Sequence, residues 1–254
     1  MEHYPSPFKK PKSRRKMRLE YDLPPLVPRS GQRVIVYIDI KSPYAFVALK
    51  PTFALEHELG MRFDWRPLTL DIPSYLGSAR KKDGQVVEST RSPSQWSGVK
   101  YAYRDARRYV ERQGYILKGT EKIWDSSIAN IGILWVVDQA RDKLEAYLEA
   151  VYPKFWRREL NIEDPSVISR CLESAGISAL GFTEFQQGIG RQVHDQLQAR
   201  LHGNGIYGVP TYVVDQHILF GREHLPLLRW HLLGKPGDAP DMAYEISYPE
   251  PRAN

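Results

Sequence analysis

Four stretches of the chain have the hydrophobic pattern of β-strands. The run Val34–Ile40 is β-branched and aromatic, which is typical of a buried strand, and Met61–Leu68 alternates as a second one. Two further strands are expected at Thr211–Val214 and His217–Phe220, joined by a turn at Asp215-Gln216. The first two strands should be parallel because a helix connects them.

Apolar residues with helical spacing dominate most of the remaining chain. The first helix is expected at Pro43–Leu59, and the last opens at Gly221–His224 and runs to about Leu233. Between them we expect helices over Trp96–Arg112, Ser126–Ala140, Lys143–Trp156, Pro165–Ser174 and Thr183–Leu201. The polar stretch Gly77–Ser97 is interpreted as a long loop, and a loop of this length is often a lid or a binding element.

Composition indicates a globular protein. The 254 residues are 42% hydrophobic, which is enough for a packed core. No apolar run approaches the roughly 18 residues of a membrane span, and no secretory signal precedes the first strand. We therefore expect a cytoplasmic protein without a membrane partner. The single cysteine, Cys171, permits no intramolecular disulfide, and we expect a buried, unreactive thiol and no metal site.

The positive charge is concentrated at one end of the chain. The formal net charge of +6 comes from 36 basic and 30 acidic residues, and residues 1–18 hold seven basic and one acidic of these. We predict that residues 1–32 form a basic, Pro-rich disordered arm and that residues 235–254 form a tail without chemistry. No aromatic residue interrupts the basic run at 9–18, so nucleic acid is not an expected partner.

The junction around Ser42 is the first candidate for chemistry. Ser42 is placed to cap the helix and Pro43 suits its first position. An anion at this helix N-terminus would be stabilised by about 0.3–1 kcal/mol. A second candidate is Pro210, because a proline that enters a strand usually has a local role. A simple helix cap and an ordinary turn proline remain the alternative interpretations.

Three motifs, in this order along the chain, resemble the kappa-class glutathione transferase and 2-hydroxychromene-2-carboxylate isomerase family. They are Ser42-Pro43-Tyr44-Ala45, Gly208-Val209-Pro210-Thr211 and Phe220-Gly221-Arg222-Glu223. Related thioredoxin-fold oxidoreductases carry Cys-x-x-Cys where this chain has the first motif. The resemblance covers roughly residues 33–233 and implies an α/β, thioredoxin-like fold. Residues 33–70 and 203–234 would form the thioredoxin-like domain, and residues 71–202 an inserted all-helical domain.

In that family the reactive sulfur comes from bound glutathione, so the resemblance implies glutathione as cofactor and Ser42 as the catalytic residue that stabilises its thiolate. A cis Pro210 would let the backbone of Val209 pair with the cysteinyl group of glutathione. The implied glutathione-binding residues are Pro43, Val209, Pro210, Phe220, Gly221, Arg222 and Glu223. Arg91 and Lys100 correspond to the lid region and are carried over as substrate-binding residues.

The resemblance favours a glutathione-dependent isomerase of the 2-hydroxychromene-2-carboxylate type, acting on a small aromatic substrate. One alternative is a kappa-class-like transferase or peroxidase acting on an electrophilic substrate. Another is a non-catalytic thioredoxin-fold module that binds peptide or glutathione. The missing Cys-x-x-Cys argues against dithiol–disulfide oxidoreductase activity, and the family suggests a homodimer.

Overall fold

The computed structural model describes residues 33–241, and the predicted arm and most of the predicted tail lie outside them. A central sheet of four strands has the order β2-β1-β5-β6. Its strands are β1 (Val34–Ile38), β2 (Asp64–Pro67), β5 (Thr211–Val214) and β6 (His217–Phe220). All four expected strands are therefore confirmed, and each lies within residues 33–70 or 203–234.

The sheet brings together segments that are far apart in the sequence. β1 runs parallel to β2, as the crossover rule predicts, and antiparallel to β5, with Val34 opposite Val214. The strands β1, β2 and β5 are fully buried: β1 and β5 carry mostly apolar side chains, and in β2 the buried Asp64 and Arg66 form an ion pair (2.5 Å). β1 is thus a central strand that holds the two thioredoxin-like segments together.

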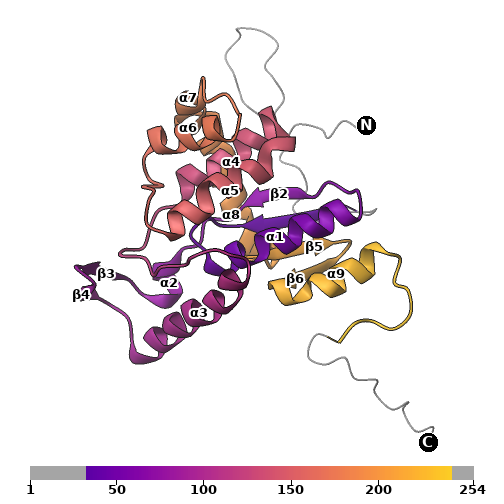
Figure 1. The fold of residues 1–254 in the computed structure, drawn as a ribbon, viewed down its shortest axis with the longest axis horizontal. Helices are drawn as coiled ribbons and strands as arrows, with labels where there is room; N and C mark the ends of the chain where they lie inside the picture. Colours follow the sequence, from indigo (N-terminus) through magenta and orange to yellow (C-terminus); the bar gives the residue numbers. More distant parts are fainter. Residues whose placement is uncertain (1–32, 242–254) are drawn as a thin grey trace, which may run out of the picture.

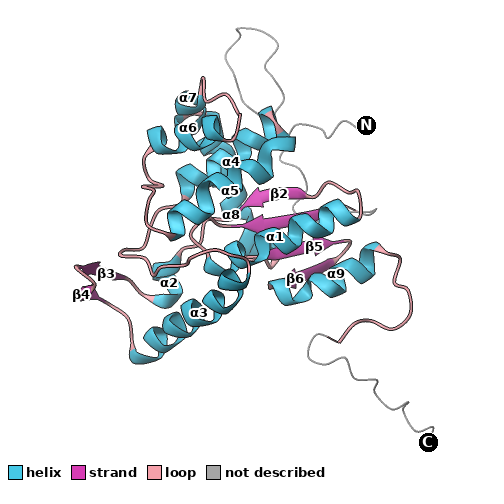
Figure 2. Ribbon diagram, in the orientation of Figure 1, coloured by secondary structure: helices cyan, strands magenta, loops and turns pink. Residues whose placement is uncertain are grey.

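Helices account for most of the rest of the described chain (Figures 1 and 2). They are α1 (Pro43–Glu58), α2 (Ile72–Leu76), α3 (Pro93–Arg112), α4 (Ser127–Gln139), α5 (Leu144–Trp156), α6 (Pro165–Ser174), α7 (Phe182–Gln187), α8 (Ile189–Leu201) and α9 (Leu225–Leu232). Short 3₁₀ turns are η1 (Arg141–Lys143), η2 (His202–Asn204) and η3 (Arg222–His224). Among the described residues, no helix is both long and apolar enough to cross a membrane.

The inserted region is helical with one exception, so the expectation of an all-helical insert was wrong. Residues 77–92, predicted as a loop, contain an antiparallel hairpin of β3 (Ala79–Lys82) and β4 (Gln85–Ser89). Asp83 and Gly84 form its turn with φ values of 52° and 79°, as a tight hairpin requires. The hairpin projects away from the main body beside α2 and α3 (Figure 1).

Two other boundaries differ from the predicted ones. The helix expected over Thr183–Leu201 is broken at Gly188, where φ and ψ of −106° and −112° interrupt the hydrogen-bond ladder between α7 and α8. The helix expected from Gly221 begins instead with the 3₁₀ turn η3, and α9 follows it. The remaining expected helices are present within a few residues of their predicted ends.

A buried carboxylate joins α1 to the sheet and to the helical insert. Glu56 accepts hydrogen bonds from the Phe63 amide (3.0 Å), the Trp65 indole (2.9 Å) and the Arg141 guanidinium (2.6 Å). Arg141 also donates to the Phe63 carbonyl (2.9 Å). Because the partners of Glu56 come from the β2 segment and from η1 of the insert, this cluster fixes the packing of the insert on the thioredoxin-like core.

Candidate active site

Ser42 caps α1 as the sequence predicts. Its hydroxyl oxygen accepts a hydrogen bond from the Ala45 amide (3.2 Å), and its own amide donates to the Asp39 carbonyl (2.9 Å). Pro43 occupies the first helical position. Ser42 is 4% exposed, and this exposed part faces a cavity. The local sequence thus holds a hydroxyl and a helix N-terminus at the wall of one cavity.

The peptide bond between Val209 and Pro210 is cis, as expected. Val209 is 5% exposed and lines the same cavity as Ser42. Within residues 33–241, no group hydrogen-bonds to the amide or the carbonyl of Val209. A buried peptide group without partners at a cavity wall is suited to pair with an extended peptide-like ligand.

The cavity between these elements has a volume of about 800 Å³, a typical size for a small-molecule site. Most of its lining is apolar or aromatic. Of the predicted site residues, the following line it: Ser42, Pro43, Arg91, Val209 and Phe220. Tyr44 and Tyr75 also line the cavity, and burial is the main reason that the pKa of each phenol is raised to about 12. Both phenols therefore stay protonated at neutral pH. The Tyr44 hydroxyl donates to the Asp105 carboxylate (3.3 Å), whereas the Tyr75 hydroxyl can donate to a ligand.

The third motif lies beside the cavity, and only Phe220 contributes to its wall. The Gly221 amide donates to the Pro210 carbonyl (2.9 Å), which ties this motif to the cis-proline loop. The Arg222 guanidinium lies 3.5 Å from the centre of the Tyr109 ring, so it is already stacked on an aromatic face. The Glu223 carboxylate is folded back against Gly221, where a side chain on residue 221 would meet it.

The two lid residues are separated by the structure. Arg91 follows β4, donates to the Gly77 carbonyl (3.4 Å) and lies 4.9 Å from the Trp96 ring centre. It borders the 800 Å³ cavity, whereas Lys100 on α3 borders a second, smaller cavity. Arg91 is thus placed to reach a ligand next to Ser42, and Lys100 is not.

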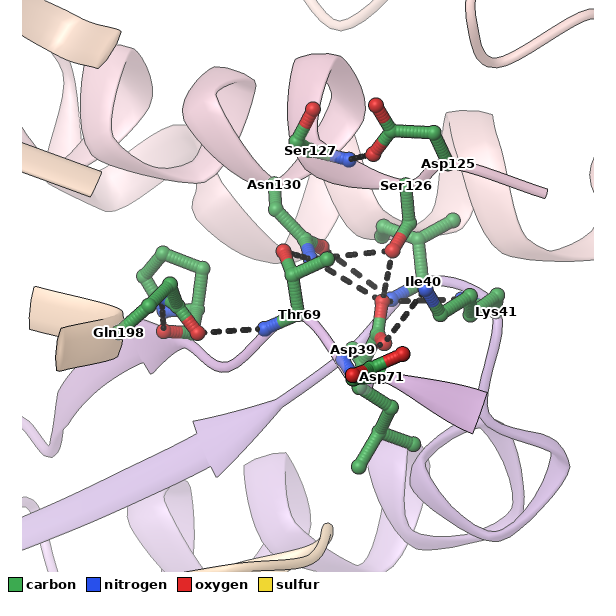
Figure 3. Close-up of polar contacts among 12 residues, drawn as sticks. Asp39, Ile40, Lys41, Thr69, Asp71, Asp125, Ser126, Ser127, Asn130 and Gln198 are labelled. Carbon is green, nitrogen blue, oxygen red and sulfur yellow. Dashed lines mark hydrogen bonds and ion pairs between the residues drawn. The ribbon is translucent and has the colours of Figure 1, made fainter. Parts of the chain in front are cut away.

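A buried polar group that the sequence analysis did not single out supports the Ser42 turn (Figure 3). We call it the Asp39 cluster: the side chains of Asp39, Thr69, Ser126 and Asn130. The fully buried Asp39 carboxylate accepts from the Ser126 hydroxyl (2.5 Å), the Asn130 amide (3.0 Å) and the backbone amides of Lys41 (3.3 Å) and Leu70 (2.8 Å). The cluster therefore joins the end of β1, the segment after β2 and the start of α4, and Asp39 is the residue whose carbonyl accepts from the Ser42 amide.

The Asp39 cluster continues to α8 through Thr69. The Thr69 hydroxyl oxygen accepts from Asn130 (2.7 Å), so its hydrogen is available for Nε2 of His194 (2.8 Å). Nδ1 of His194 then donates to Asp195 (2.8 Å), which defines a neutral imidazole. Burial lowers the pKa of His194 below its usual value, consistent with that neutral form. The only sequence signal for this network is an acidic residue, Asp39, within an apolar strand.

Lys41 stands between the Asp39 cluster and the cavity. Its side chain is 8% exposed, and its ammonium lies 4.0 Å from the Asp39 carboxylate. The hydrogen bond of Asp125 to the Ser127 amide, aided by the nearby Lys41 charge, lowers the pKa of Asp125 despite its partial burial. The ammonium thus lies beside the Asp39 carboxylate, at a residue that lines the cavity next to Ser42.

The single cysteine is buried, as expected. Cys171 lies on α6, is buried, and forms no disulfide. Burial raises the pKa of its thiol, so the thiolate is disfavoured. Any reactive sulfur at the Ser42 site must therefore come from a bound molecule.

The sheet order, the capped helix α1 and the cis-proline loop facing it define a thioredoxin-fold protein with a helical insertion. The model of the DsbA-like thioredoxin domain family matches residues 33–233, and the chain belongs to this family. Since the match spans both thioredoxin-like segments and the insert, the described elements form one family unit.

Two relatives carry the name that the sequence motifs suggested. A curated protein of Sphingobium xenophagum, 2-hydroxychromene-2-carboxylate isomerase, is 24% identical over 198 residues, which is 78% of this chain and 96% of the relative. The solved structure of a 2-hydroxychromene-2-carboxylate isomerase has a TM-score of 0.61 at 18% identity and covers 79% of this chain and 94% of its own. The predicted resemblance is thus confirmed.

Oxidoreductases share the fold as well. A probable DsbA oxidoreductase from Streptomyces coelicolor has a TM-score of 0.60 at 18% identity and covers 82% of this chain and 92% of its own. The cytosolic disulfide reductase DsbM from Pseudomonas aeruginosa, in a structure with GSH, has a TM-score of 0.51 at 13% identity and covers 80% and 98%. At such identities these structures show the fold alone.

Proposed function

We propose that the chain is a glutathione-dependent isomerase of the 2-hydroxychromene-2-carboxylate type, in which Ser42 stabilises the glutathione thiolate. The observation that carries the proposal is that Ser42 and Val209, which are 167 positions apart in the sequence, line one cavity. The isomerase relative, matched over 96% of its length, supports this choice of reaction.

The residues of the cavity fit glutathione. The unpaired amide and carbonyl of Val209 match the backbone groups of its cysteinyl residue. Pro43 would shape one wall, the cis bond to Pro210 would hold the Val209 backbone at the cavity, and Phe220 would cover one end. Gly221, Arg222 and Glu223 follow directly and would meet the γ-glutamyl end, with Glu223 close enough to Tyr44 to affect the pKa of its phenol. The structure of DsbM with GSH supports glutathione as a ligand of this fold.

The role of Ser42 follows from its hydrogen bonds. Its oxygen already accepts from the Ala45 amide, so the hydroxyl hydrogen is left to donate into the cavity. A free thiol has a pKa of about 8.5, and each unit of depression needs about 1.4 kcal/mol of additional anion stabilisation. One hydroxyl and one helix N-terminus would together supply about one to two units.

Bound glutathione would supply a thiolate that adds reversibly to a conjugated aromatic pyruvate and is later expelled, which allows rotation about the former double bond. The protein's own contribution is to orient and to desolvate. The apolar cavity would hold the aromatic ring, Lys41 next to Ser42 would contact the substrate carboxylate, and Arg91 would bind the part of the substrate away from its reacting end. Tyr75, protonated at neutral pH, would donate to a developing enolate oxygen.

A kappa-class-like transferase or peroxidase would use the same thiolate and differ in its substrate, and a binding module would hold glutathione without activating it. The quartet Ser42–Ala45 contains no sulfur, so we propose that dithiol–disulfide exchange is absent. A screen of aromatic pyruvates and of electrophiles with the glutathione-bound protein separates the two catalytic possibilities.

The experiment is glutathione binding by calorimetry, with the ultraviolet absorbance of the bound thiolate followed against pH. We expect a depressed thiol pKa in the native protein and a pKa about one unit higher in Ser42→Ala. Ser92→Ala is the matched control, because Ser92 caps α3 with a similar hydrogen bond and lines neither cavity. It should lose stability and leave the thiol pKa unchanged.

Two results would contradict the proposal. Absence of binding at millimolar glutathione would exclude both catalytic possibilities. Binding with an unshifted thiol pKa in the native protein would leave the non-catalytic module, because the site would then hold glutathione without activating it.

A further inference from the structure

A second cavity lies next to the first, and nothing in the proposed reaction uses it. Its volume is about 330 Å³. We call it the cationic annex, and its wall is formed by the start of the hairpin, one side of α3 and the segment 119–123. The lining residues used below are Lys81, Arg91, Lys100, Arg107, Glu121 and Lys122.

The lining of the annex carries mainly positive charge. Five of these side chains are cationic, and Glu121 is the one acidic residue in the lining. Glu121 is paired with Arg158 (3.1 Å), which lies outside the annex, so it does not compensate the cations of the wall. A concave surface with this balance raises the local concentration of anions.

Two of the five cations are engaged by contacts within the fold. Lys122 pairs with Glu163 (2.5 Å), and Arg107 donates to the Leu117 carbonyl (2.9 Å). Within residues 33–241, Lys81, Arg91 and Lys100 have no carboxylate partner. Lys81 is nevertheless held in place, because its amide donates to the Glu121 carbonyl (2.7 Å).

Arg91 is partly buried in this arrangement. Burial lowers the pKa of its guanidinium, the direction expected when a cation leaves water without gaining an anionic partner. Its two contacts, the Gly77 carbonyl and the Trp96 ring, fix the plane of the guanidinium and satisfy few of its five donors. The remaining donors are available to a ligand.

The annex and the main cavity share a wall. Residues bordering both are Arg91, Val99, Tyr103, Thr120, Lys122 and Ile123. A single ligand could therefore place an apolar body in the larger cavity, near Ser42, and a charged group in the annex. Arg91 and Lys122 border both cavities, so they would contact such a ligand where its apolar body meets its charged group.

We propose that the cationic annex binds a dianionic phosphate group, and that the substrate is an aromatic compound carrying such a group at the end opposite its reacting centre. A monoanionic carboxylate would be satisfied by one or two cations, whereas three uncompensated cations around one small cavity match a dianion. This inference deepens the proposed function, on which it relies only for the position of the reacting end beside Ser42.

The test is calorimetric titration of the full chain, without glutathione, with 1-naphthyl phosphate, 1-naphthoate and 1-naphthol. We expect the phosphate to bind at least about 10-fold more tightly than the alcohol at low salt, with the carboxylate in between. Lys81→Gln and Lys100→Gln should each weaken phosphate binding about 5-fold and leave the alcohol unaffected. Inorganic phosphate should compete with the ester, which shows that the group itself is recognised.

Two controls separate the annex from general surface charge. Lys82→Gln changes the neighbouring lysine of the same hairpin, and Arg104→Gln an exposed cation one turn along α3; neither residue lines the annex. Circular dichroism establishes that all variants are folded. Equal affinity for the three naphthyl compounds, or equal losses in Lys81→Gln and Lys82→Gln, would overturn the proposal.

The outcome is distinguishable from failure of the proposed function. Lysine-dependent phosphate binding in a protein that does not bind glutathione would establish the annex and refute the isomerase. Glutathione binding with a Ser42-dependent thiol pKa, in a protein that does not prefer the phosphate, would support the proposed function and refute the phosphate site in the annex.

Discussion

Replacing Asp39 by asparagine tests whether the Asp39 cluster holds the Ser42 turn in place. The substitution preserves shape but exchanges one carboxylate oxygen for a donor. One oxygen of Asp39 accepts from Ser126, Asn130 and the Lys41 amide, and the other accepts from the Leu70 amide (2.8 Å). The least disruptive orientation puts the new NH₂ toward Leu70, because that sacrifices one hydrogen bond and keeps three.

The magnitude follows from that one lost bond. A buried amide left without an acceptor costs about 1–3 kcal/mol. The three remaining bonds lose their charge assistance and Lys41 loses its carboxylate partner, but the variant no longer buries a carboxylate, so these effects oppose each other. We therefore expect the free energy of unfolding to fall by about 2 kcal/mol in Asp39→Asn.

Urea denaturation followed by circular dichroism measures this change directly. Asp71→Asn is the matched control, since Asp71 lies near Asp39 in Figure 3 but is exposed, and its side chain makes no capping hydrogen bond. The control should lie within about 0.5 kcal/mol of the native protein. If Asp39→Asn unfolds at the same urea concentration as Asp71→Asn, the cluster does not support the turn and the reasoning is refuted.

Two further predictions concern buried polar groups. Tyr212→Phe removes the hydroxyl 2.8 Å from Thr52 and should lower the free energy of unfolding by about 1 kcal/mol in urea denaturation, whereas Tyr101→Phe, at an exposed site, should not. The pKa of buried His194 is lowered, so the unfolded chain takes up its proton more readily and protonation favours unfolding. Stability should therefore fall as the pH decreases below about 6.5, by up to roughly 1.4 kcal/mol per pH unit from this group. Denaturation at several pH values should show this loss reduced in His194→Gln and unchanged in His57→Gln; equal losses in both variants would contradict it.

Local chemistry made the Ser42 junction and all four sheet strands predictable. A β-branched run defines β1. The pair Ser42-Pro43 defines the start of α1, because serine is a good helix cap and proline suits the first helical position. The β3–β4 hairpin was missed because its strands are polar and exposed, so their hydrophobic pattern carries little signal. The Asp83-Gly84 pair, a typical hairpin turn, was the available clue.

The Asp39 cluster could not be predicted, because its members come from distant segments. Leu70 and Asn130 lie 31 and 91 positions from Asp39, and no local pattern pairs them. The cavity that Lys100 borders was unpredictable for a related reason, because only the packing of α3 determines which cavity a residue of this helix reaches. The sequence offered one clue, namely that Asp39 is an acidic residue within the apolar run Val34–Ile40 and therefore needs buried polar partners.

The pairing of β1 with β5 also constrains how the protein is made. During synthesis β1 and β2 emerge early, yet one edge of β1 stays unpaired until Thr211–Val214 follows. An unpaired apolar edge is a site for association between nascent chains. The backbone hydrogen bonds of the intervening helices are local, so these helices can form in the meantime and shorten the loop that the last strands must close. Ser42 and Val209 face each other only after this step, so glutathione binding would report the completion of folding.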